Sequence, residues 1–524
     1  MADLGLGDRQ RALAEFLKAA SDAETVEVTR IGLLAGGAIQ ENWGIDASFE
    51  GGRLSGTQRL VLRTDAATGV PSSLGRLDEF RVLKAAFDAG VAVAEPLFAC
   101  ADKAVIGRPF FVMRRVTGSA AGRPITLDPT LEAARPALAE RLGRELARLQ
   151  TIRPSRSDLD FLEPYDGPLP QIAAFRAYLD QHPNPRPVLE WALRWAETHR
   201  PAPLPPVLCH RDFRTGNYML DGTRLTAVLD WEFAGWGDPD EDIGWLCCKG
   251  WRFGRLDREA GGIAGREPFY RGYEAESGRR LDPERIKFWE VYANIRWAII
   301  ALQQSDRFLI GGSRSLSTAI TGRRATECEL ELLMLLDGEG CQSRLSPPPR
   351  PSSIEREGDA PDVWRDLPRS RDLLALARET LLDELAPLLP PERRRDAHLI
   401  ATVMAIAARE REGGGWWEEF VARMADFYAA SAPHPNLLPA SGERERPEIP
   451  SPRLRGEGAE RSEAGEGQPL ARFAADLRNG AFETSPSQLK AARAILWRLT
   501  IDKLREGNPQ FLAANGFKAD RQGT

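Results

Sequence analysis

Residues 207–220 read VLCHRDFRTGNYML and place an octet of the form H-x-D-x-x-x-x-N between two short apolar stretches. A second acidic group follows in residues 226–232, TAVLDWE, where Asp230 comes directly after an apolar run. Short apolar runs flanked by polar turns are typical of strands, so Asp212, Asn217 and Asp230 are expected at strand ends. We therefore expect these three side chains to form one polar centre.

Such a centre suits phosphoryl transfer, a reaction that needs an aligned hydroxyl, a nucleotide and metal ions that offset negative charge. Asp212 would act as the catalytic base that accepts or orients the acceptor hydroxyl. Asn217 would give a neutral oxygen to one Mg²⁺, and Asp230 a carboxylate that bridges the metals. The octet alone is a weak pattern, and its specificity comes from the strand-flanked Asp230. A structural or degenerate site is the alternative interpretation.

Three segments together resemble the aminoglycoside-phosphotransferase and choline-kinase superfamily: HRDFRTGN at 210–217, LDWE at 229–232 and GDPDEDIGW at 237–245. The likeness is closest to bacterial phosphotransferases similar to the kinase-like domain of certain acyl-CoA dehydrogenase fusions, and it covers roughly residues 25–335. It implies an α+β, bilobal protein-kinase-like fold followed by a mainly α-helical C-terminal domain. It also implies Mg²⁺ and ATP or GTP as the phosphoryl donor.

The same resemblance places nucleotide-binding residues in the N-terminal part. Gly36 and Gly37 fall where a turn covering the nucleotide is expected, since glycine permits close backbone approach to phosphates. A plain hairpin turn is the alternative. Arg63 stands where kinases usually have Lys, and it can pair with phosphate through two hydrogen bonds. Glu79 would orient Arg63, unless it belongs to a solvated helix face.

Further motif residues are expected to bind through the backbone or to support the loop. Met113 and Arg115 fall in the hinge segment whose backbone would meet the adenine. Asp242 is expected to hold the loop, through His210 or backbone groups, with a surface helix cap as the alternative. His210 is expected to be a structural hydrogen-bonding group, because Asp212 already supplies the proton acceptor.

The acceptor is less well indicated. The resemblance names a hydroxyacyl-CoA or related metabolite, and less favourably an antibiotic. Arg252 and other basic residues could hold an anionic acceptor. An aromatic cage for a quaternary ammonium is conceivable, although core packing is the better interpretation of this tryptophan-rich region. The tryptophans concerned are Trp231, Trp236, Trp245, Trp251, Trp289 and Trp297.

Bulk properties exclude several classes of protein. The 524 residues suggest about three compact units. A net charge of −6 gives no sign of nucleic-acid binding, which needs a concentrated basic surface. No apolar run reaches the length of roughly 20 residues that a membrane span needs, and the N-terminus lacks the layout of a secretory signal. We therefore expect a cytoplasmic protein that acts on a small-molecule hydroxyl substrate.

The family resemblance implies the two kinase-like lobes, while composition and periodicity predict the linker, the helical region and the insertion. Residues 1–117 are expected to form a kinase-like N-lobe and 118–336 a C-lobe with the catalytic loop. A Pro-rich linker is expected at 337–362. Residues 363–524 are expected to form a helical domain of unknown function, interrupted by a disordered insertion at 432–467. The fusion suggests a partner in acyl-CoA metabolism, and a nucleotide-binding scaffold or protein-interaction module is the alternative function.

The predicted elements of the N-lobe are a small antiparallel sheet interrupted by one helix. Alternating apolar residues indicate the strands, and Gly90 follows the helix as a stop signal would. The predicted strands are 26–33, 43–49, 59–63 and 110–115, and the predicted helix is 77–89.

Overall fold

The computed structural model describes residues 9–34, 40–65, 73–311, 315–337, 370–412, 416–431 and 468–517. Contacts divide the chain into two compact units: unit 1 is residues 1–170 and 200–293, and unit 2 is residues 171–199 and 294–524. Three predictions fall wholly or largely outside the described residues: the phosphate turn at Gly36 and Gly37, the Pro-rich linker and the insertion at 432–467.

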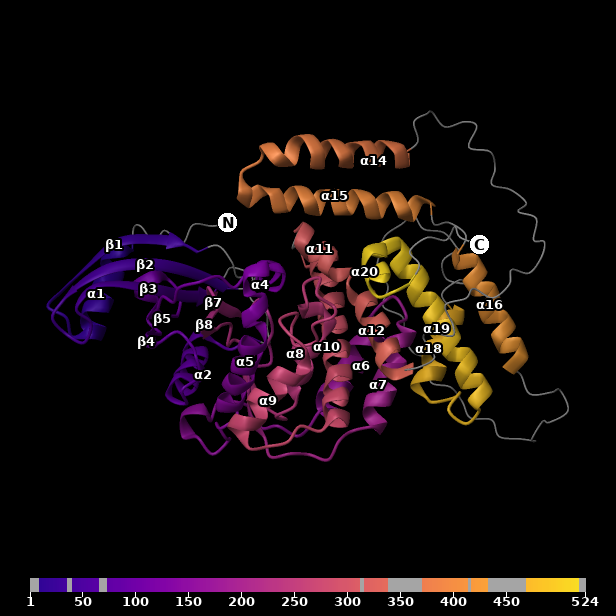
Figure 1. The fold of residues 1–524 in the computed structure, drawn as a ribbon, viewed down its shortest axis with the longest axis horizontal. Helices are drawn as coiled ribbons and strands as arrows, with labels where there is room; N and C mark the ends of the chain where they lie inside the picture. The colour runs from indigo at the N-terminus through magenta and orange to yellow at the C-terminus, as the bar shows by residue number, and fades with distance from the viewer. Residues whose placement is uncertain are drawn as a thin grey trace. The chain divides into compact units, whose positions relative to one another are not determined.

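Unit 1 begins with a five-stranded sheet and the helices packed on it (Figure 1). These elements are α1 (Gln10–Ser21), β1 (Thr25–Leu33), β2 (Gln40–Glu50), β3 (Gly56–Asp65), α2 (Arg76–Asp88), β4 (Pro96–Cys100), α3 (Lys103–Ile106) and β5 (Phe110–Arg114).

The rest of unit 1 is mainly helical, with two small two-stranded sheets. Its elements are α4 (Gly122–Leu127), η1 (Pro129–Ala134), α5 (Arg135–Leu149), η2 (Ser157–Leu159), β6 (Val207–Cys209), β7 (Tyr218–Asp221), β8 (Arg224–Val228), β9 (Gly235–Gly237), α8 (Glu241–Cys247), η3 (Lys249–Trp251), α9 (Arg266–Ser277) and the first part of α10 (Pro283–Leu309).

The large sheet is antiparallel throughout, with the strand order β1-β2-β3-β5-β4. Its register places Arg63 of β3 between Asn42 of β2 and Phe111 of β5. The prediction of a small antiparallel sheet is confirmed, but two helices, α2 and the short α3, lie between its strands instead of the one predicted. Strand β4 was not predicted, because the five residues PLFAC begin with Pro and are too few to show a clear alternation.

Alternate residues of β5 point to opposite faces of the sheet and therefore enter different cores. Phe110 and Val112 pack in one core with Leu17 of α1. Phe111 packs in the other core, which also contains Leu83 of α2. Full burial of each such side chain stabilises the fold by about 1.5–3 kcal/mol, so the sheet is anchored on both faces.

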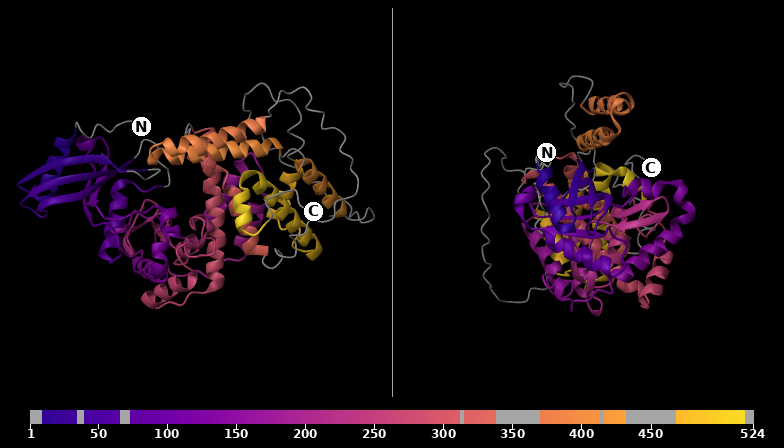
Figure 2. Two further views of the ribbon diagram at one scale, coloured as in Figure 1. Left: turned by 45° about the horizontal axis from the view of Figure 1, so that its top comes forward. Right: turned by 90° about the vertical axis from the view of Figure 1, so that its left-hand side faces the viewer.

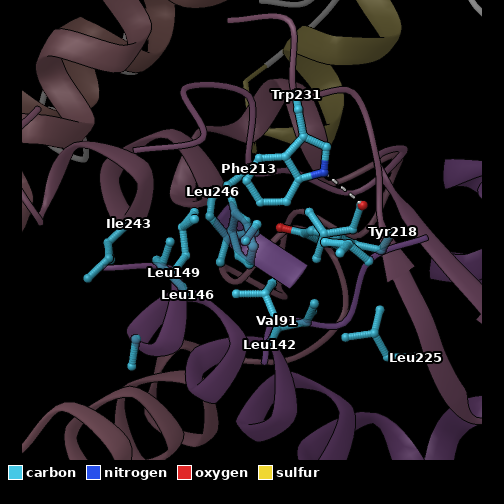
Figure 3. Packing of buried hydrophobic residues seen from close by; sticks show 14 of the residues in the cluster. Val91, Leu142, Leu146, Leu149, Phe213, Tyr218, Leu225, Trp231, Ile243 and Leu246 are labelled. Atoms are coloured by element: carbon cyan, nitrogen blue, oxygen red, sulfur yellow. Dashed lines mark hydrogen bonds between the residues drawn. The ribbon is translucent and has the colours of Figure 1, made fainter. Parts of the chain in front are cut away.

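The second core continues beneath residues 210–217. Figure 3 shows Phe213 and Trp231 among the aliphatic side chains of this cluster, which include Leu142 of α5 and Leu246 of α8. The indole nitrogen of Trp231 donates a hydrogen bond of 3.1 Å to the carbonyl of Val228. The apolar residues on either side of the polar loop thus fix the path of its backbone.

Two glycines allow α5 and α9 to pack unusually closely. A Cβ atom at Gly143 would lie 2.2 Å from the carbonyl oxygen of Phe269, and one at Gly272 would lie 2.0 Å from that of Glu140. Both distances are far below van der Waals contact, and the obstructing atoms are backbone. Any larger residue at either position would force these two helices apart.

Unit 2 is entirely helical over its described residues. Its elements are α6 (Leu169–Gln181, counted from its third residue), α7 (Pro187–Thr198), the second part of α10, α11 (Leu316–Gly322), α12 (Ala325–Asp337), α14 (Ser370–Glu379), η4 (Thr380–Leu385), η5 (Ala386–Leu388), α15 (Pro391–Glu412), α16 (Trp416–Ser431), α18 (Gln468–Arg478), α19 (Pro486–Gly507) and α20 (Pro509–Ala514). The prediction of a mainly helical C-terminal region is confirmed.

The C-terminal helices of unit 2 pack on helices that occur much earlier in the chain. Helix α18 contacts α7, and α19 contacts α12, as both ribbon views show (Figures 1 and 2). Arg478 pairs with Glu190 at 2.6 Å, and Arg493 pairs with Asp337 at 3.0 Å. Asp337 also accepts a 2.8 Å hydrogen bond from the indole of Trp497. We call these contacts the helical seam.

No helix within the described ranges is long and apolar enough to span a membrane. The contact-based units do not follow the predicted domain boundaries, because α6, α7 and α12 group with the C-terminal helices. The division into N-lobe, C-lobe, linker and helical domain therefore stays a prediction.

Candidate active site

The predicted polar residues lie on a loop between two small sheets. Residues 210–217 connect β6, which pairs with β9, to β7, which pairs with β8. Asp230 lies two residues beyond the end of β8. The backbone N–H of Leu229 donates to the carbonyl of Asn217 at 2.8 Å, so the segment before Asp230 is tied directly to the loop. Asp212, Asn217 and Asp230 are thereby brought into one centre.

Asp212 is held by three donors. Its Oδ1 accepts hydrogen bonds from Nε of Arg214 at 2.8 Å and from the indole nitrogen of Trp245 at 2.9 Å. Its Oδ2 accepts one from Nδ2 of Asn217 at 2.7 Å. Each carboxylate oxygen can accept about two hydrogen bonds, so Oδ2 keeps the one open position. The side chain is 13% exposed, and a hydroxyl can reach that oxygen.

Asp242 holds the start of the loop, as predicted. Its Oδ2 accepts the backbone N–H of His210 and its Oδ1 that of Arg211, each at 2.7 Å. Arg211 has a φ of 61°, a left-handed conformation that costs a non-glycine residue about 1–3 kcal/mol. The two hydrogen bonds offset this strain and keep the loop in its bent form. The neighbouring Asp238 instead pairs with Arg285 at 2.7 Å.

His210 is a structural group, which confirms the prediction. It is fully buried, and burial lowers its pKa to about 4, although Asp212 acts in the opposite direction. The backbone N–H of Asp212 points at Nδ1 at 3.2 Å, so Nδ1 accepts and the proton is on Nε2. Nε2 then donates to the carbonyl of Leu229 at 2.9 Å. A neutral His210 thus joins the two ends of the centre.

Arg63 connects the sheet to this centre. It pairs with Glu79 of α2 at 2.9 Å and with Asp230 at 3.1 Å, so the predicted ion pair with Glu79 is confirmed. Burial alone would lower the pKa of Arg63, but the carboxylates of Glu79 and Asp230 outweigh burial and raise it. Its Nη2 is buried and makes no hydrogen bond to any described residue. The guanidinium therefore has one donor group left for a ligand.

A second arginine, which was not predicted, lies beside Glu79. Arg76, one turn earlier on α2, is fully buried and pairs with both Glu79 and Asp65. Glu232, two residues after Asp230, accepts 2.8 Å hydrogen bonds from Gln40 and Ser73. The i,i+3 spacing of Arg76 and Glu79 was the available signal. This network attaches α2 and β2 to the segment that carries Asp230.

The oxygens of Asn217 and Asp230 fit a magnesium ion. Asn217 uses its nitrogen on Asp212, and its Oδ1 accepts no hydrogen bond from a described residue. Asp230 has a φ of 62° and a side chain that is 35% exposed. Hard oxygen donors in small number are what Mg²⁺ uses. Within the described part of the chain no group of three or more His, Cys, Asp or Glu side chains could hold a metal.

The other predicted nucleotide-binding residues lie along the sheet. Met113, on β5, pairs in register with Val61 of β3 and with Pro96 of β4. Arg115 follows β5, and its backbone N–H donates to the carbonyl of Arg59 at 2.9 Å. Both therefore lie at the end of the strand that leads into the helical part, where the hinge is predicted.

Arg252 and the tryptophans serve the structure. Arg252 donates to the carbonyls of Cys247 and Leu256 at 2.6 and 2.8 Å and faces Glu290 at 3.6 Å. Its Nε makes no hydrogen bond to a described residue, but the whole side chain is buried, so the suggested role in acceptor binding is not favoured. Five of the six tryptophans are buried, which supports core packing over an aromatic cage: Trp231, Trp236, Trp245, Trp251 and Trp289.

Unit 1 has a kinase-like fold. It combines a five-stranded sheet that carries a buried Arg–Glu pair with a helical part that carries an H-x-D-x-x-x-x-N loop and an Asp at a strand end. Residues 39–289 match the sequence model of the phosphotransferase enzyme family (APH). The fold is shared with the crystal structure of a proposed aminoglycoside phosphotransferase from Ralstonia eutropha. That likeness has a TM-score of 0.50 and 23% identity, and it covers 61% of this chain and 95% of the other.

Two curated relatives carry acyl-CoA dehydrogenase names. Acyl-CoA dehydrogenase family member 10 of Mus musculus is 28% identical over 300 residues, which are 53% of this chain and 27% of the relative. Acyl-CoA dehydrogenase family member 11 of Gallus gallus is 33% identical over 204 residues, which are 36% of this chain and 25% of the relative. The chain thus matches about a quarter of each relative. Family and fold support a small-molecule phosphotransferase of the kinase type.

Proposed function

We propose that this protein transfers the γ-phosphoryl group of ATP or GTP to a hydroxyl group of a small molecule. The observation that carries the proposal is one continuous network of Asp212, Asn217, Asp230 and Arg63. These side chains come from the loop, the end of β8 and the sheet. Such convergence of one base, two hard oxygen donors and one cation is what phosphoryl transfer requires.

Each residue has a distinct task in the proposed reaction. Asp212 accepts a hydrogen bond from the acceptor hydroxyl at the open position of Oδ2 and takes its proton as transfer proceeds. Asn217 and Asp230 would hold Mg²⁺ through their side-chain oxygens. When bound, the metal offsets the negative charge of the nucleotide phosphates. Arg63, fixed by Glu79, offers its unused Nη2 to a phosphate oxygen.

The remaining nucleotide contacts are proposed from the family likeness. Gly36 and Gly37 would cover the phosphates, and the backbone near Met113 and Arg115 would meet the base. The cytoplasmic location and a partner in acyl-CoA metabolism also remain proposals, because the relatives that suggest the latter match only in part. No described contact identifies such a partner.

Mg²⁺-dependent nucleotide binding is the first test. A ligand that binds only the folded state raises its stability by about 2.7 kcal/mol at a hundredfold excess over its dissociation constant. We expect the melting temperature to rise with ATP or GTP plus Mg²⁺, and the rise to disappear with EDTA or in Asp230→Asn. Asp257→Asn, an exposed aspartate paired only with Arg255, is the matched control and should behave as wild type.

The same experiment separates the rival functions. No shift with either nucleotide at millimolar concentration would make the interaction module the leading interpretation. A shift without any turnover of the γ-phosphoryl group, to water or to a panel of alcohols, would favour a nucleotide-binding scaffold. Turnover that Asp212→Asn abolishes would support the kinase.

A further inference from the structure

The guanidinium of Arg214 lies beside the catalytic carboxylate but is only partly used by the protein. Its Nε donates to Oδ1 of Asp212 at 2.8 Å, and its Nη1 donates to the carbonyl of Thr215 at 3.3 Å. Its Nη2 makes no hydrogen bond to any described residue. The side chain is 24% exposed, so this third nitrogen is accessible from solvent.

The unused nitrogen faces a particular direction. In a guanidinium, Nε and Nη2 form one edge of the planar fork and point the same way. An arginine that served only Asp212 would fill this edge with both carboxylate oxygens. Here Oδ2 of Asp212 is turned to Asn217 instead, which leaves the Nη2 donor beside the position where an acceptor hydroxyl would bind.

The position of the guanidinium is built into the fold. Its central carbon lies 4.5 Å from the ring centre of Trp251, and Trp251 itself stacks on Trp245 at 5.0 Å. Gly216 leaves the space that Arg214 needs, because a Cβ atom there would lie 2.8 Å from Nη1. Both indoles are buried, so they hold the cation in one plane.

The segment that carries Trp251 is also basic. Residues 249–266, KGWRFGRLDREAGGIAGR, contain five Lys and Arg against two Asp and Glu, a net charge of +3. The four arginines of this segment each pair with a carboxylate: Arg255 with Asp257, Arg258 with Glu132, and Arg252 and Arg266 with Glu290. Arg214, which stacks on Trp251 of this segment, differs because its Nη2 has no partner among the described residues and is left for a ligand.

We propose that Arg214 is a specificity-determining residue that selects acceptors with an anionic group, a carboxylate or a phosphate, close to the reacting hydroxyl. The proposal rests on the proposed phosphotransferase function and names its substrate class. An anion next to the hydroxyl would pair with Nη2 while the hydroxyl bonds to Oδ2 of Asp212. A cationic acceptor would instead bring its charge against the guanidinium, which disfavours amine-rich substrates.

The test compares acceptors that differ by one charge. The pairs are glycerate with glycerol and 3-hydroxybutyrate with 1,3-butanediol, and kanamycin supplies a polycation. Because a hydrogen bond to a charged group contributes about 1.5–3 kcal/mol, we expect kcat/KM to favour the carboxylate of each pair by about tenfold or more. In Arg214→Met the ratio should fall to about one, and in Arg214→Lys it should be intermediate, since the charge remains without the fork.

The donor's γ-phosphoryl group is the other anion that Nη2 could meet, and nucleotide affinity distinguishes the two. If Arg214 binds the acceptor, Arg214→Met should keep its affinity for Mg²⁺–nucleotide within about threefold of wild type. A parallel loss of nucleotide affinity would overturn the proposal and assign Arg214 to the donor. Arg255→Met, an exposed arginine of the same segment, is the matched control and should change neither affinity nor ratio.

The remaining outcomes also either support or overturn the role of Arg214. Neutral or cationic acceptors used as well as the carboxylates, or a wild-type ratio that persists in Arg214→Met, would overturn the proposal. If no compound is turned over, binding is measured instead of turnover. Calorimetry then titrates glycerate and 3-hydroxybutyrate into the protein saturated with Mg²⁺ and a non-hydrolysable nucleotide. Binding lost in Arg214→Met supports the proposal, and no binding up to about 100 mM refutes it. Failure of wild type to bind Mg²⁺–nucleotide would instead refute the underlying phosphotransferase function.

Discussion

The catalytic centre and the helical seam both gather acids and arginines, but they leave them in opposite states. In the seam, Glu190 and Asp337 are 5% and 2% exposed and are fully paired with residues of α18 and α19. In the centre, Asp230 is 35% exposed, and Arg63 and Arg214 each keep a donor without a described partner. The two regions therefore differ in their acids, which are buried and paired in the seam but partly exposed at Asp230. Unpaired guanidinium nitrogens occur in both, since Nε of Arg493 in the seam also lacks a hydrogen-bond partner among the described residues.

The difference teaches how to assign a role to a charged cluster. A buried ion pair rarely adds much net stability, yet removal of one partner leaves an uncompensated charge. The seam should therefore respond to substitution through unfolding, and the centre through loss of chemistry at nearly unchanged stability. The seam also means that residues 1–337 without α18 and α19 would expose several buried acids, so a separate N-terminal fragment is expected to fold poorly.

The largest effect is expected at the base. Asp212→Asn removes the proton acceptor and keeps the shape of the side chain. Its single oxygen can still accept from Arg214 and Trp245, while the hydrogen bond from Asn217 is lost. Phosphoryl transfer should fall by about 10²–10⁴-fold, while the thermal shift with Mg²⁺–nucleotide persists. Steady-state turnover and thermal shift on the same preparation check this, with Asp257→Asn as the control. Unchanged turnover would remove Asp212 from the mechanism.

The next effect breaks the seam. Glu190 pairs with Arg478 and, at 2.7 Å, with Arg176. Glu190→Ala removes one of the two carboxylates that each arginine contacts, since Arg176 keeps Glu197 and Arg478 keeps Asp180. The change should lower the free energy of unfolding by about 1–3 kcal/mol. Glu419→Ala breaks the exposed pair with Arg423 and should cost less than about 1 kcal/mol. Urea denaturation measures the loss of unfolding free energy in both variants. Equal losses would contradict the distinction between buried and exposed pairs.

The third prediction concerns the stability of the folded protein at acidic pH. His210 has a folded pKa of about 4, below the ordinary value of 6.5. Between these pH values the unfolded chain binds a proton that the folded chain does not, so stability falls as pH falls through this window. The loss attributable to His210 is about 3 kcal/mol at most. Denaturation of wild type and His210→Gln at pH 7 and pH 4.5 measures it, since the variant should lose less; equal losses contradict the assignment.

The smallest effect is at alkaline pH in unit 2. Burial lowers the pKa of Lys503 to about 8, while Glu329 opposes the shift. Above pH 8 the unfolded lysine still binds a proton that the folded one releases, so stability should rise with pH up to about 10.5. Because its side chain is 22% exposed, we expect a gain of only about 1 kcal/mol. Lys503→Met should lack this gain in denaturation at pH 7.5 and 9.5, and its persistence would refute the assignment.

Much of the fold could be predicted from sequence because the relevant signals are local. Alternating apolar residues indicated β1, β2, β3 and β5, and apolar periodicity indicated the helices of the C-terminal region. Strand β4 was missed because it is short. The helices that unit 2 groups together could not be anticipated, because α7 and α18 are separated by about 270 residues and no local pattern links Glu190 to Arg478.

The candidate site divides in the same way. The spacing of Asp212, Asn217 and Asp230 was visible in the sequence, whereas the pairing of Arg63 with Glu79 was predicted from the family resemblance. The donation from Trp245 to Asp212 was not, since a tryptophan in an apolar helix is interpreted as core. Trp245 is buried as expected and also donates a hydrogen bond to Asp212, the proposed base.

The sequence by itself determined which chemical groups this protein can bring to a reaction: a loop aspartate, two hard oxygen donors and an arginine on a sheet strand. These depend on residue type and short spacing, which local rules describe. Only the tertiary structure decided which charges are closed and which stay open. That distinction depends on burial and on the surrounding structure. It separates Arg252, whose side chain is only 5% exposed and donates to backbone carbonyls, from Arg214, which is 24% exposed and keeps one edge for a ligand.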